Sequence, residues 1–174
     1  MKNISLLALL LCAVIGPLQA EEQSATESED HFWLEPGLSY GKPTVSGGLD
    51  MRYNFSDYTV ALGAISRFDD SGDIKQDSTF RLLAGKYFYP GEHEFLLEVG
   101  LATVRYSETV PYESDVSTGT ETVYNNTLGI PVRFAKYFNG KYVGFALTAD
   151  VMYTKEEWIT TAGFSVPFGK LRRF

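Results

Sequence analysis

Apolar and polar residues alternate along residues 127–153, TLGIPVRFAKYFNGKYVGFALTADVMY, and an Asn-Gly pair lies at the centre of this stretch. Asn139-Gly140 is the strongest short signal for a two-residue type I′ turn, because both turn positions require a positive φ. A chain folded there forms a β-hairpin with Phe134 opposite Phe145. One face of this hairpin is apolar and the other is small, polar or charged, so a shift of one residue would scramble both faces.

The same rhythm of strands and turns continues through the chain from Phe32 onward. The runs are rich in Val, Tyr, Phe and Thr, and no 3.6-residue period persists in them, which predicts strands rather than helices. The eight expected strands are Phe32–Gly41, Thr44–Phe55, Tyr58–Phe68, Ser78–Tyr89, Glu94–Ser107, Thr122–Phe138, Lys141–Thr154 and Trp158–Lys170.

The connections between these strands alternate in length. Tight turns are expected at Ser56-Asp57, Tyr89–Glu92 and Asn139-Gly140, whereas Asp69–Asp77 and Glu108–Glu121 are long and polar. The longer connections therefore fall at one end of the molecule, as in an up-and-down meander of antiparallel strands closed into a barrel. In barrels of the outer membrane the tight turns face the periplasm and the longer loops face outward.

The composition of the two strand faces indicates which one points into the barrel. One face is rich in Leu, Val, Ile and Phe, and the other in Gly and charged residues. The second face is unsuited to the surface of a soluble barrel, but it suits the lumen of a narrow eight-stranded one. The apolar face should therefore contact lipid, and the predicted fold class is an all-β, eight-stranded antiparallel up-and-down transmembrane β-barrel.

Four arginines and four carboxylates are expected in the lumen. They are Glu35, Asp50, Arg52, Arg67, Arg81, Glu98, Arg133 and Asp150. Arginine can bind a carboxylate through two parallel hydrogen bonds, and a buried charge without a partner is costly. We interpret this set as a paired charge network that fills a closed lumen, with a path for ions or protons as the alternative.

Aromatic residues gather near the strand ends and predict two girdles at the membrane interfaces. The girdle at the tight turns would contain Phe55, Tyr58, Tyr87, Tyr89, Tyr137, Phe138 and Tyr142, and the girdle at the loops Phe68, Tyr106, Tyr124, Tyr153 and Trp158. The fourth strand fits this pattern least well, because Lys86 would face lipid and Leu83 the lumen. Either Lys86 extends to the interface or a β-bulge changes the parity there.

Residues 1–20 have the features of a secretory signal peptide, namely Lys2, an apolar run and a cleavage region ending at Ala20. The run is too short to span a bilayer comfortably as a helix, and it contains Cys12, the one cysteine of the chain. Residues 21–31 are acidic and are expected to form a disordered tail, which leaves residues 32–174 for the barrel. The formal charge of −7 argues against nucleic-acid binding.

With the eight strands in place, residues 32–174 resemble the small outer-membrane β-barrel proteins of the OmpA/OmpX-like superfamily. Ile130–Phe134, IPVRF, is similar to a strand motif of that superfamily, and Thr161-x-Gly163-x-x-Val166-x-Phe168 resembles its C-terminal targeting signal. The chain also ends in Phe174, although Arg172-Arg173 interrupts the usual apolar alternation. The resemblance implies a bacterial outer-membrane location, assembly by the barrel-insertion machinery, and contact with outer-membrane lipids and lipopolysaccharide. A monomer is expected.

Some barrels of this kind modify lipid A, and such chemistry requires a nucleophile, a base and an orienting group close together. After the signal peptide the chain contains only His31 and His93, and neither is expected near the loops on a lipid-facing strand. The acidic run Asp69–Asp73 lacks the spacing of an EF-hand and is interpreted as a turn. No catalytic residue, cofactor or metal site is therefore predicted, and the chain is not expected to be an enzyme.

The expected function is a structural or surface-interaction role in the outer membrane, exercised through extracellular loops. Loop Glu108–Glu121 is the favoured partner-binding surface, since recognition often resides in loops on a rigid scaffold, although a mobile solvated loop is an alternative. Arg105 should face outward near the loops, either contacting lipopolysaccharide phosphates or acting as an ordinary interfacial arginine. The alternative functions are a lipid A-modifying enzyme and a narrow, porin-like channel. A charge at Leu147 should impair insertion far more than one at Ala146.

Overall fold

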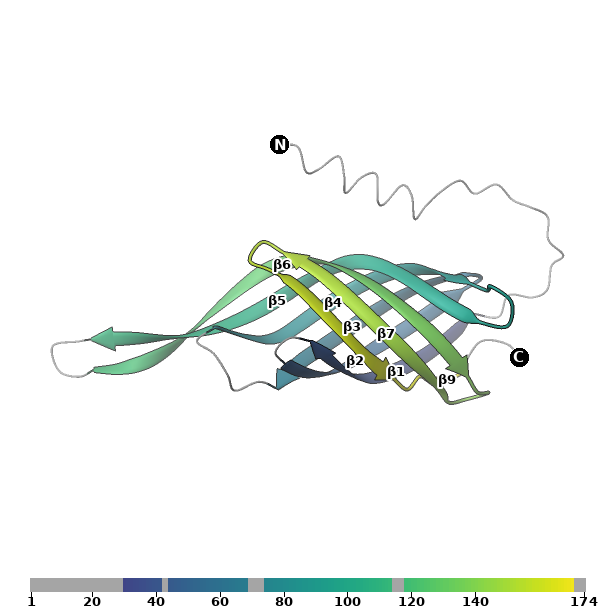
Figure 1. The fold of residues 1–174 in the computed structure, drawn as a ribbon, viewed down its shortest axis with the longest axis horizontal. Coiled ribbons are helices and arrows are strands. Elements are labelled where there is room, and N and C mark those ends of the chain that lie inside the picture. Colours follow the sequence, from purple (N-terminus) through teal and green to yellow (C-terminus); the bar gives the residue numbers. More distant parts are fainter. Residues whose placement is uncertain (1–29, 42–43, 69–73, 114–117, 171–174) are drawn as a thin grey trace, which may run out of the picture.

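The computed structural model describes residues 30–41, 44–68, 74–113 and 118–170. All strand pairings are antiparallel, and from β1 to β8 each strand pairs with the next along the chain. The strands are β1 (His31–Gly41), β2 (Thr44–Phe55), β3 (Tyr58–Phe68), β4 (Ile74–Phe88), β5 (Glu94–Glu113), β6 (Thr118–Asn139), β7 (Gly144–Thr154), β8 (Trp158–Ser165) and β9 (Phe168–Gly169). Because β1 pairs with both β2 and β8, the sheet closes on itself (Figure 1).

The short strand β9 continues β8 and does not add a ninth strand to the barrel wall. Both segments pair with β1 in one register, with Ser165 opposite Gly37 and Gly169 opposite Trp33. The interruption falls at Val166-Pro167, where proline has no N–H to donate to the ladder, while the Val166 amide still donates to the Pro36 carbonyl at 2.9 Å. The molecule is therefore a closed eight-stranded antiparallel barrel, and the predicted fold class is confirmed.

Side chains alternate between the two faces of every strand, as the strand period of two requires. The outward face is apolar, with large exposed side chains such as Leu62, Leu82, Leu101 and Leu147. The inward face contains buried charged, aromatic and small residues. The apolar face that the sequence predicts to point outward therefore does so in the structure, and the face rich in charged residues and glycine points into the barrel.

The predicted tight turns lie together at one end of the barrel, the turn end, and the connection from β5 to β6 lies at the opposite end, the loop end. The turn end contains Ser56-Asp57, the segment from Tyr89 to His93, and the segment from Gly140 to Val143. At the loop end, β5 and β6 continue as a two-stranded hairpin well beyond the barrel wall (Figure 1). The expectation of a long irregular loop at Glu108–Glu121 is therefore wrong for all but residues 114–117, which lie outside the described part. The ladder continues there because Thr and Val favour extended structure.

The β6–β7 hairpin has a different register from the one its Asn-Gly pair predicts. Phe138, not Phe134, lies opposite Phe145, and Gly140 does not have a positive φ. The connection is longer than two residues because Tyr142 and Val143 pair with the β9 segment, where the Gly169 amide donates to the Tyr142 carbonyl at 3.0 Å. The shift is by an even number of residues, so every side chain stays on its expected face.

The fourth strand keeps a single parity through its barrel part. Leu83 is buried in the lumen, and Lys86 faces outward with its Nζ 5.5 Å from the centre of the Tyr58 ring. The β4–β5 ladder is irregular between Gln76 and Ser78, far from Lys86. Of the two alternatives, the structure therefore has an outward lysine near the turn end and no change of parity beside it.

Several further expectations lie outside the described residues, including the signal peptide, Phe174 and most of the acidic tail. The barrel begins one residue earlier than expected, because His31 is the first residue of β1 and is buried. Asp30 accepts a hydrogen bond from the Tyr53 hydroxyl at 2.6 Å. Within the described ranges, the chain has no helix that is long and apolar enough to cross a membrane.

Candidate functional site

Charged side chains from six strands meet in the middle of the lumen. Alternation along each strand turns them inward, and the registers place Glu35 opposite Asp50, Glu98 opposite Arg133, and Arg133 opposite Asp150. Seven of the eight predicted charged residues are joined by ion pairs, and we call these the lumen network: Glu35, Asp50, Arg52, Arg81, Glu98, Arg133 and Asp150.

Arg52 is at the centre of one half of the lumen network. Its Nε donates to Glu35 Oε2 at 2.5 Å, and its Nη2 donates to Glu98 Oε2 at 2.9 Å. A second bond joins Nη1 to Glu98 Oε1, so the guanidinium binds that carboxylate through two parallel bonds. The side chains of Arg52, Glu35 and Glu98 are all fully buried. Removal of any one of them would leave a buried charge without its main partner.

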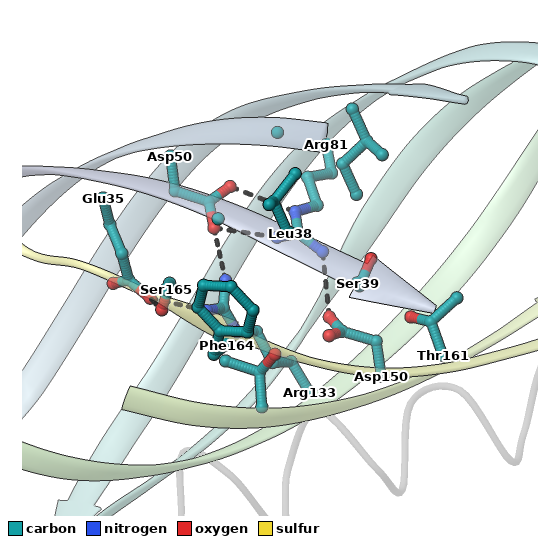
Figure 2. A pocket seen from close by; sticks show the side chains of 14 residues that line it. Glu35, Leu38, Ser39, Asp50, Arg81, Arg133, Asp150, Thr161, Phe164 and Ser165 are labelled. Carbon is teal, nitrogen blue, oxygen red and sulfur yellow. Dashed lines mark hydrogen bonds and ion pairs between the residues drawn. The ribbon is translucent and has the colours of Figure 1, made fainter. Parts of the chain in front are cut away.

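Arg133 and Arg81 connect the other half of the network (Figure 2). Arg133 donates to both Glu35 and Asp50. Arg81 binds Asp50 through two bonds of 3.1 and 2.8 Å and reaches Asp150 Oδ1 at 2.9 Å. Arg52 Nη2 also reaches Asp50 Oδ2 at 3.4 Å, so Asp50 is bound by three arginines. These arginines compensate for its position opposite Glu35, since like charges across a ladder repel.

Neutral donors complete the coordination of Glu35. Ser165 Oγ donates to Oε1 at 2.5 Å, the Tyr137 hydroxyl donates to Oε2 at 2.9 Å, and Trp33 Nε1 donates to Oε2 at 3.3 Å. A buried carboxylate needs this number of donors because both oxygens offer several lone-pair positions. The Glu35 carboxylate is therefore bound from four strands, β1, β2, β6 and β8.

A glycine in β3 makes room for the network. A Cβ atom built on Gly63 would lie only 1.9 Å from Asp50 Oδ1, so any side chain there would displace the carboxylate that Arg81 and Arg133 bind. Gly63 pairs directly with Asp50 and Arg81 on the neighbouring strands. Glycine in a strand interior weakens the strand, and its presence here is explained by this close approach.

Apolar clusters lie on either side of the lumen network. Along β5 the inward residues run from Leu96 through Glu98 to Ala102, so the network lies between the two clusters. The turn-end cluster contains Trp33, Tyr87, Leu96, Ala135, Tyr137 and Ala146. The loop-end cluster contains Ala102, Val104, Tyr106, Met152 and Ile159.

These clusters correct the predicted aromatic girdles. Tyr87, Tyr137 and Tyr106 are buried inside the barrel and do not contact the membrane interface. The ring of Trp33 packs on those of Tyr87 and Tyr137, with centroids 6.4 and 6.0 Å away. Proximity to a strand end suggested the girdle, but strand parity decides the direction of a side chain. Parity read residue by residue would have assigned all three tyrosines to the lumen.

Arg67, the eighth predicted charge, lies nearer the loop end. It is four residues beyond Gly63 on β3 and pairs across to Ser46. It lines a small cavity of about 30 Å³ together with Thr79 and Met152. A second cavity of about 40 Å³ touches Asp50, Arg81 and Asp150 (Figure 2). Spaces of this size hold a few water molecules at most.

Neither histidine lies near the loops. His31 pairs with Asn54 beside the β2–β3 turn, and His93 is exposed in the β4–β5 turn. In the described part of the chain no group of three or more His, Cys, Asp or Glu residues is arranged to hold a metal ion. The lumen carboxylates instead face arginines, and that arrangement is suited to a fixed polar core.

No protein-family model and no curated protein matches the chain. The fold resembles the N-terminal β-barrel domain of OprF from Pseudomonas aeruginosa, with a TM-score of 0.55, 19% sequence identity and coverage of 82% of this chain and 99% of that one. It also resembles neisserial surface protein A, with a TM-score of 0.56, 12% identity and coverage of 82% and 96%.

The closed barrel with an apolar exterior and these two likenesses define the class of protein. The chain has the fold of the small eight-stranded outer-membrane β-barrels. At such low identities the likeness concerns the fold, and fold alone does not determine function.

Proposed function

We propose that this chain is an integral protein of the bacterial outer membrane, exported by its N-terminal signal peptide and assembled as a monomer by the barrel-insertion machinery. Its role in this proposal is surface interaction, with the barrel as a rigid support and the β5–β6 hairpin as the binding element. The observation that carries it is the hairpin itself, which extends beyond the barrel wall (Figure 1). Sedimentation with the outer-membrane fraction, in a form whose gel mobility changes on boiling, tests the location.

In the part of the β5–β6 hairpin beyond the barrel wall, the edges of β5 and β6 differ in their capacity to pair with a further strand. β4 pairs with β5 only as far as Glu108, and β7 pairs with β6 only from Gly129. From Thr118 to Leu128, β6 therefore pairs with β5 alone in the described part of the chain. On the outer edge of β5, Pro111 lacks an N–H and opposes strand addition. An extended segment of a partner can add to the β6 edge through main-chain hydrogen bonds.

The charge of the hairpin favours a basic partner. Residues 108–121 contain three Glu and one Asp and neither Lys nor Arg. Complementary charge steers association and disfavours like-charged competitors. The proposed partner is therefore an extended protein segment with basic side chains.

Removing residues 109–122 and joining Glu108 to Val123 with an Asn-Gly turn tests the proposed role. Glu108 and Val123 are direct partners, so the change removes only pairs within the hairpin. We expect an unchanged midpoint of barrel unfolding, together with loss of the proteins that the intact chain captures in pull-downs from an outer-membrane background. Replacement of residues 69–73 by an equally long Gly/Ser sequence is the matched control. Recovery of the same proteins with the shortened hairpin would contradict the proposal.

We also propose that the lumen is closed to ions. The two apolar clusters and the ion-paired residues between them support this, because the arginines and carboxylates fill the lumen and the two cavities beside them measure about 40 and 30 Å³. In planar bilayers the protein should give no discrete conductance steps in single-channel recordings. Steps that recur at a fixed conductance would instead support the narrow-channel alternative.

A further inference from the structure

Three successive rows of outward residues start on β2 and run across the barrel wall, the first as far as β5 and the other two as far as β6. The row in the middle of the wall is uniformly large and apolar: Met51, Leu62, Leu82 and Leu101. The next row toward the loops alternates large and small side chains: Leu49, Ala64, Phe80, Thr103 and Leu128. The third row is polar: Gly47, Ser66, Ser78, Arg105 and Asn126.

The middle of these rows forms a groove in the apolar exterior. The small residues Ala64 and Thr103 lie on either side of Phe80, which is 66% exposed. On the other side of Thr103 lies Leu128, which is 75% exposed and borders the groove there. The hollow between them has a volume of about 700 Å³ and is lined mainly by apolar side chains. Because the groove opens toward the hydrocarbon of the membrane, an acyl chain is the occupant that matches it.

A second pocket, whose lining includes several polar side chains, adjoins the loop-side end of this groove. The pocket has a volume of about 260 Å³ and is lined by Ser78, Phe80, Thr103, Arg105, Tyr124 and Asn126. Phe80 and Thr103 line both hollows, so one ligand can extend from the groove into the pocket. The Arg105 guanidinium lies 4.0 Å from the centre of the Tyr124 ring. A stacked guanidinium is held in place and can still donate from its edge to phosphate oxygens.

The polar row lies beside the exposed aromatic residues of the loop end. Elsewhere at that end the outward residues include Tyr40, Tyr153 and Trp158, which suit a generic lipid interface. On β3 to β6 the outward residues near this end include hydroxyl, amide and guanidinium donors from Ser66, Ser78, Arg105 and Asn126, beside the exposed rings of Phe68 and Tyr124. Donors above an apolar groove complement an amphiphile with an anionic headgroup.

We infer that this surface binds a phosphorylated lipid of the outer leaflet with several acyl chains, that is, the lipid A part of lipopolysaccharide. Arg105, held by Tyr124, binds a phosphate of the headgroup, and one acyl chain lies in the groove beside Thr103. The inference rests on the proposed membrane location and orientation, but it does not depend on the partner of the hairpin. The specificity of the site for this lipid comes from the combination of the Arg105 cation with the preformed apolar groove.

The test uses the full-length protein purified in neutral detergent and bis-phosphorylated, six-chain lipid A as the probe. Bound lipid is measured by native mass spectrometry, after gel mobility before and after boiling has shown that each variant is folded. Arg105→Gln should weaken binding about tenfold, because a charge-assisted bond to phosphate is lost. Thr103→Leu, which fills the groove, should weaken it severalfold. The matched controls are Lys155→Gln at the exposed β7–β8 connection and Thr160→Leu on the exposed face of β8, and both should bind as the parent does.

Equal losses for Arg105→Gln and Lys155→Gln would overturn the site, because binding would then follow overall charge. Equal losses for the two threonine variants would overturn the groove. The same lipid without phosphates should bind more weakly and should be insensitive to Arg105→Gln. Phosphatidylglycerol that binds as tightly as lipid A would overturn the assignment to a multi-acyl phosphorylated lipid. A variant that is folded by gel mobility but does not bind leaves the membrane location of the protein unaffected, so the two hypotheses fail separately.

Discussion

Replacing Arg52 with Met is expected to lower the free energy of unfolding of the barrel by about 3–5 kcal/mol. Arg52 is fully buried and is bonded to Glu35 and Glu98, whose side chains are also inaccessible to solvent. Its removal would leave two carboxylates in the lumen with much less positive charge between them. The cost comes mainly from these uncompensated charges, because the methionine itself fills much of the space that the arginine vacates.

The measurement is urea unfolding of the protein in phospholipid vesicles, followed by tryptophan fluorescence and by gel mobility without boiling. Trp33 donates to Glu35 in the same region and therefore reports on it. Arg105→Met is the matched control, since Arg105 faces outward and lies outside the lumen network, and its midpoint should stay close to that of the parent. The double variant Arg52→Met/Glu98→Gln should regain part of the lost free energy of unfolding, because it removes one of the two carboxylate charges that Arg52 would otherwise neutralise. An unchanged midpoint for Arg52→Met would contradict the network as a source of stability.

The faces of the strands could be predicted from the sequence because parity is a local property. Each buried residue alternates with an outward one, so Glu35, Asp50 and Arg133 are turned inward wherever their strands pair. The particular ion pairs depend on register, which the Asn139-Gly140 turn predicted wrongly. The actual register places Arg133 directly opposite Asp150 rather than opposite Ala146. The opposite charges of Arg133 and Asp150 are consistent with that register, whereas the Asn139-Gly140 pair indicated a different one.

The two apolar clusters could not be predicted from position along the strands alone. Tyr137 and Phe138 are neighbours at the same turn, yet one is buried with Trp33 and the other faces outward. The length of the β5–β6 hairpin was missed for another reason. Polar, Thr-rich sequence is compatible with either a loop or a strand exposed on both faces, and the choice depends on pairing between β5 and β6 rather than on composition.

The register also changes the expected effect of introducing a charged residue at positions in the barrel wall. Leu147 lies opposite Lys136, which already places a cation on the outer face near the turn end. Ala146, which the sequence suggested as a tolerant site, is fully buried in the turn-end cluster beside Tyr137. A charge at Ala146 would be enclosed by aromatic side chains, so Ala146 is unsuitable as a control. The position that isolates the cost of charge in lipid is Leu82, whose neighbours across the sheet are Leu62 and Leu101.

Leu82→Arg is expected to destabilise the barrel in vesicles by about 2–4 kcal/mol, the cost of a cation near the bilayer midplane, and to reduce the amount of folded protein in the outer membrane. Leu147→Arg should cost only about 0–1 kcal/mol, because a long side chain near the turn end can extend to the interface as Lys136 does. Thr122→Arg, on the hairpin outside the barrel wall, provides the same substitution in water and should leave stability unchanged. Urea midpoints of the three variants, compared in one vesicle composition, give the depth dependence directly. Equal destabilisation at Leu82 and Leu147 would contradict the placement of the apolar band, since position along the wall is what separates the two sites.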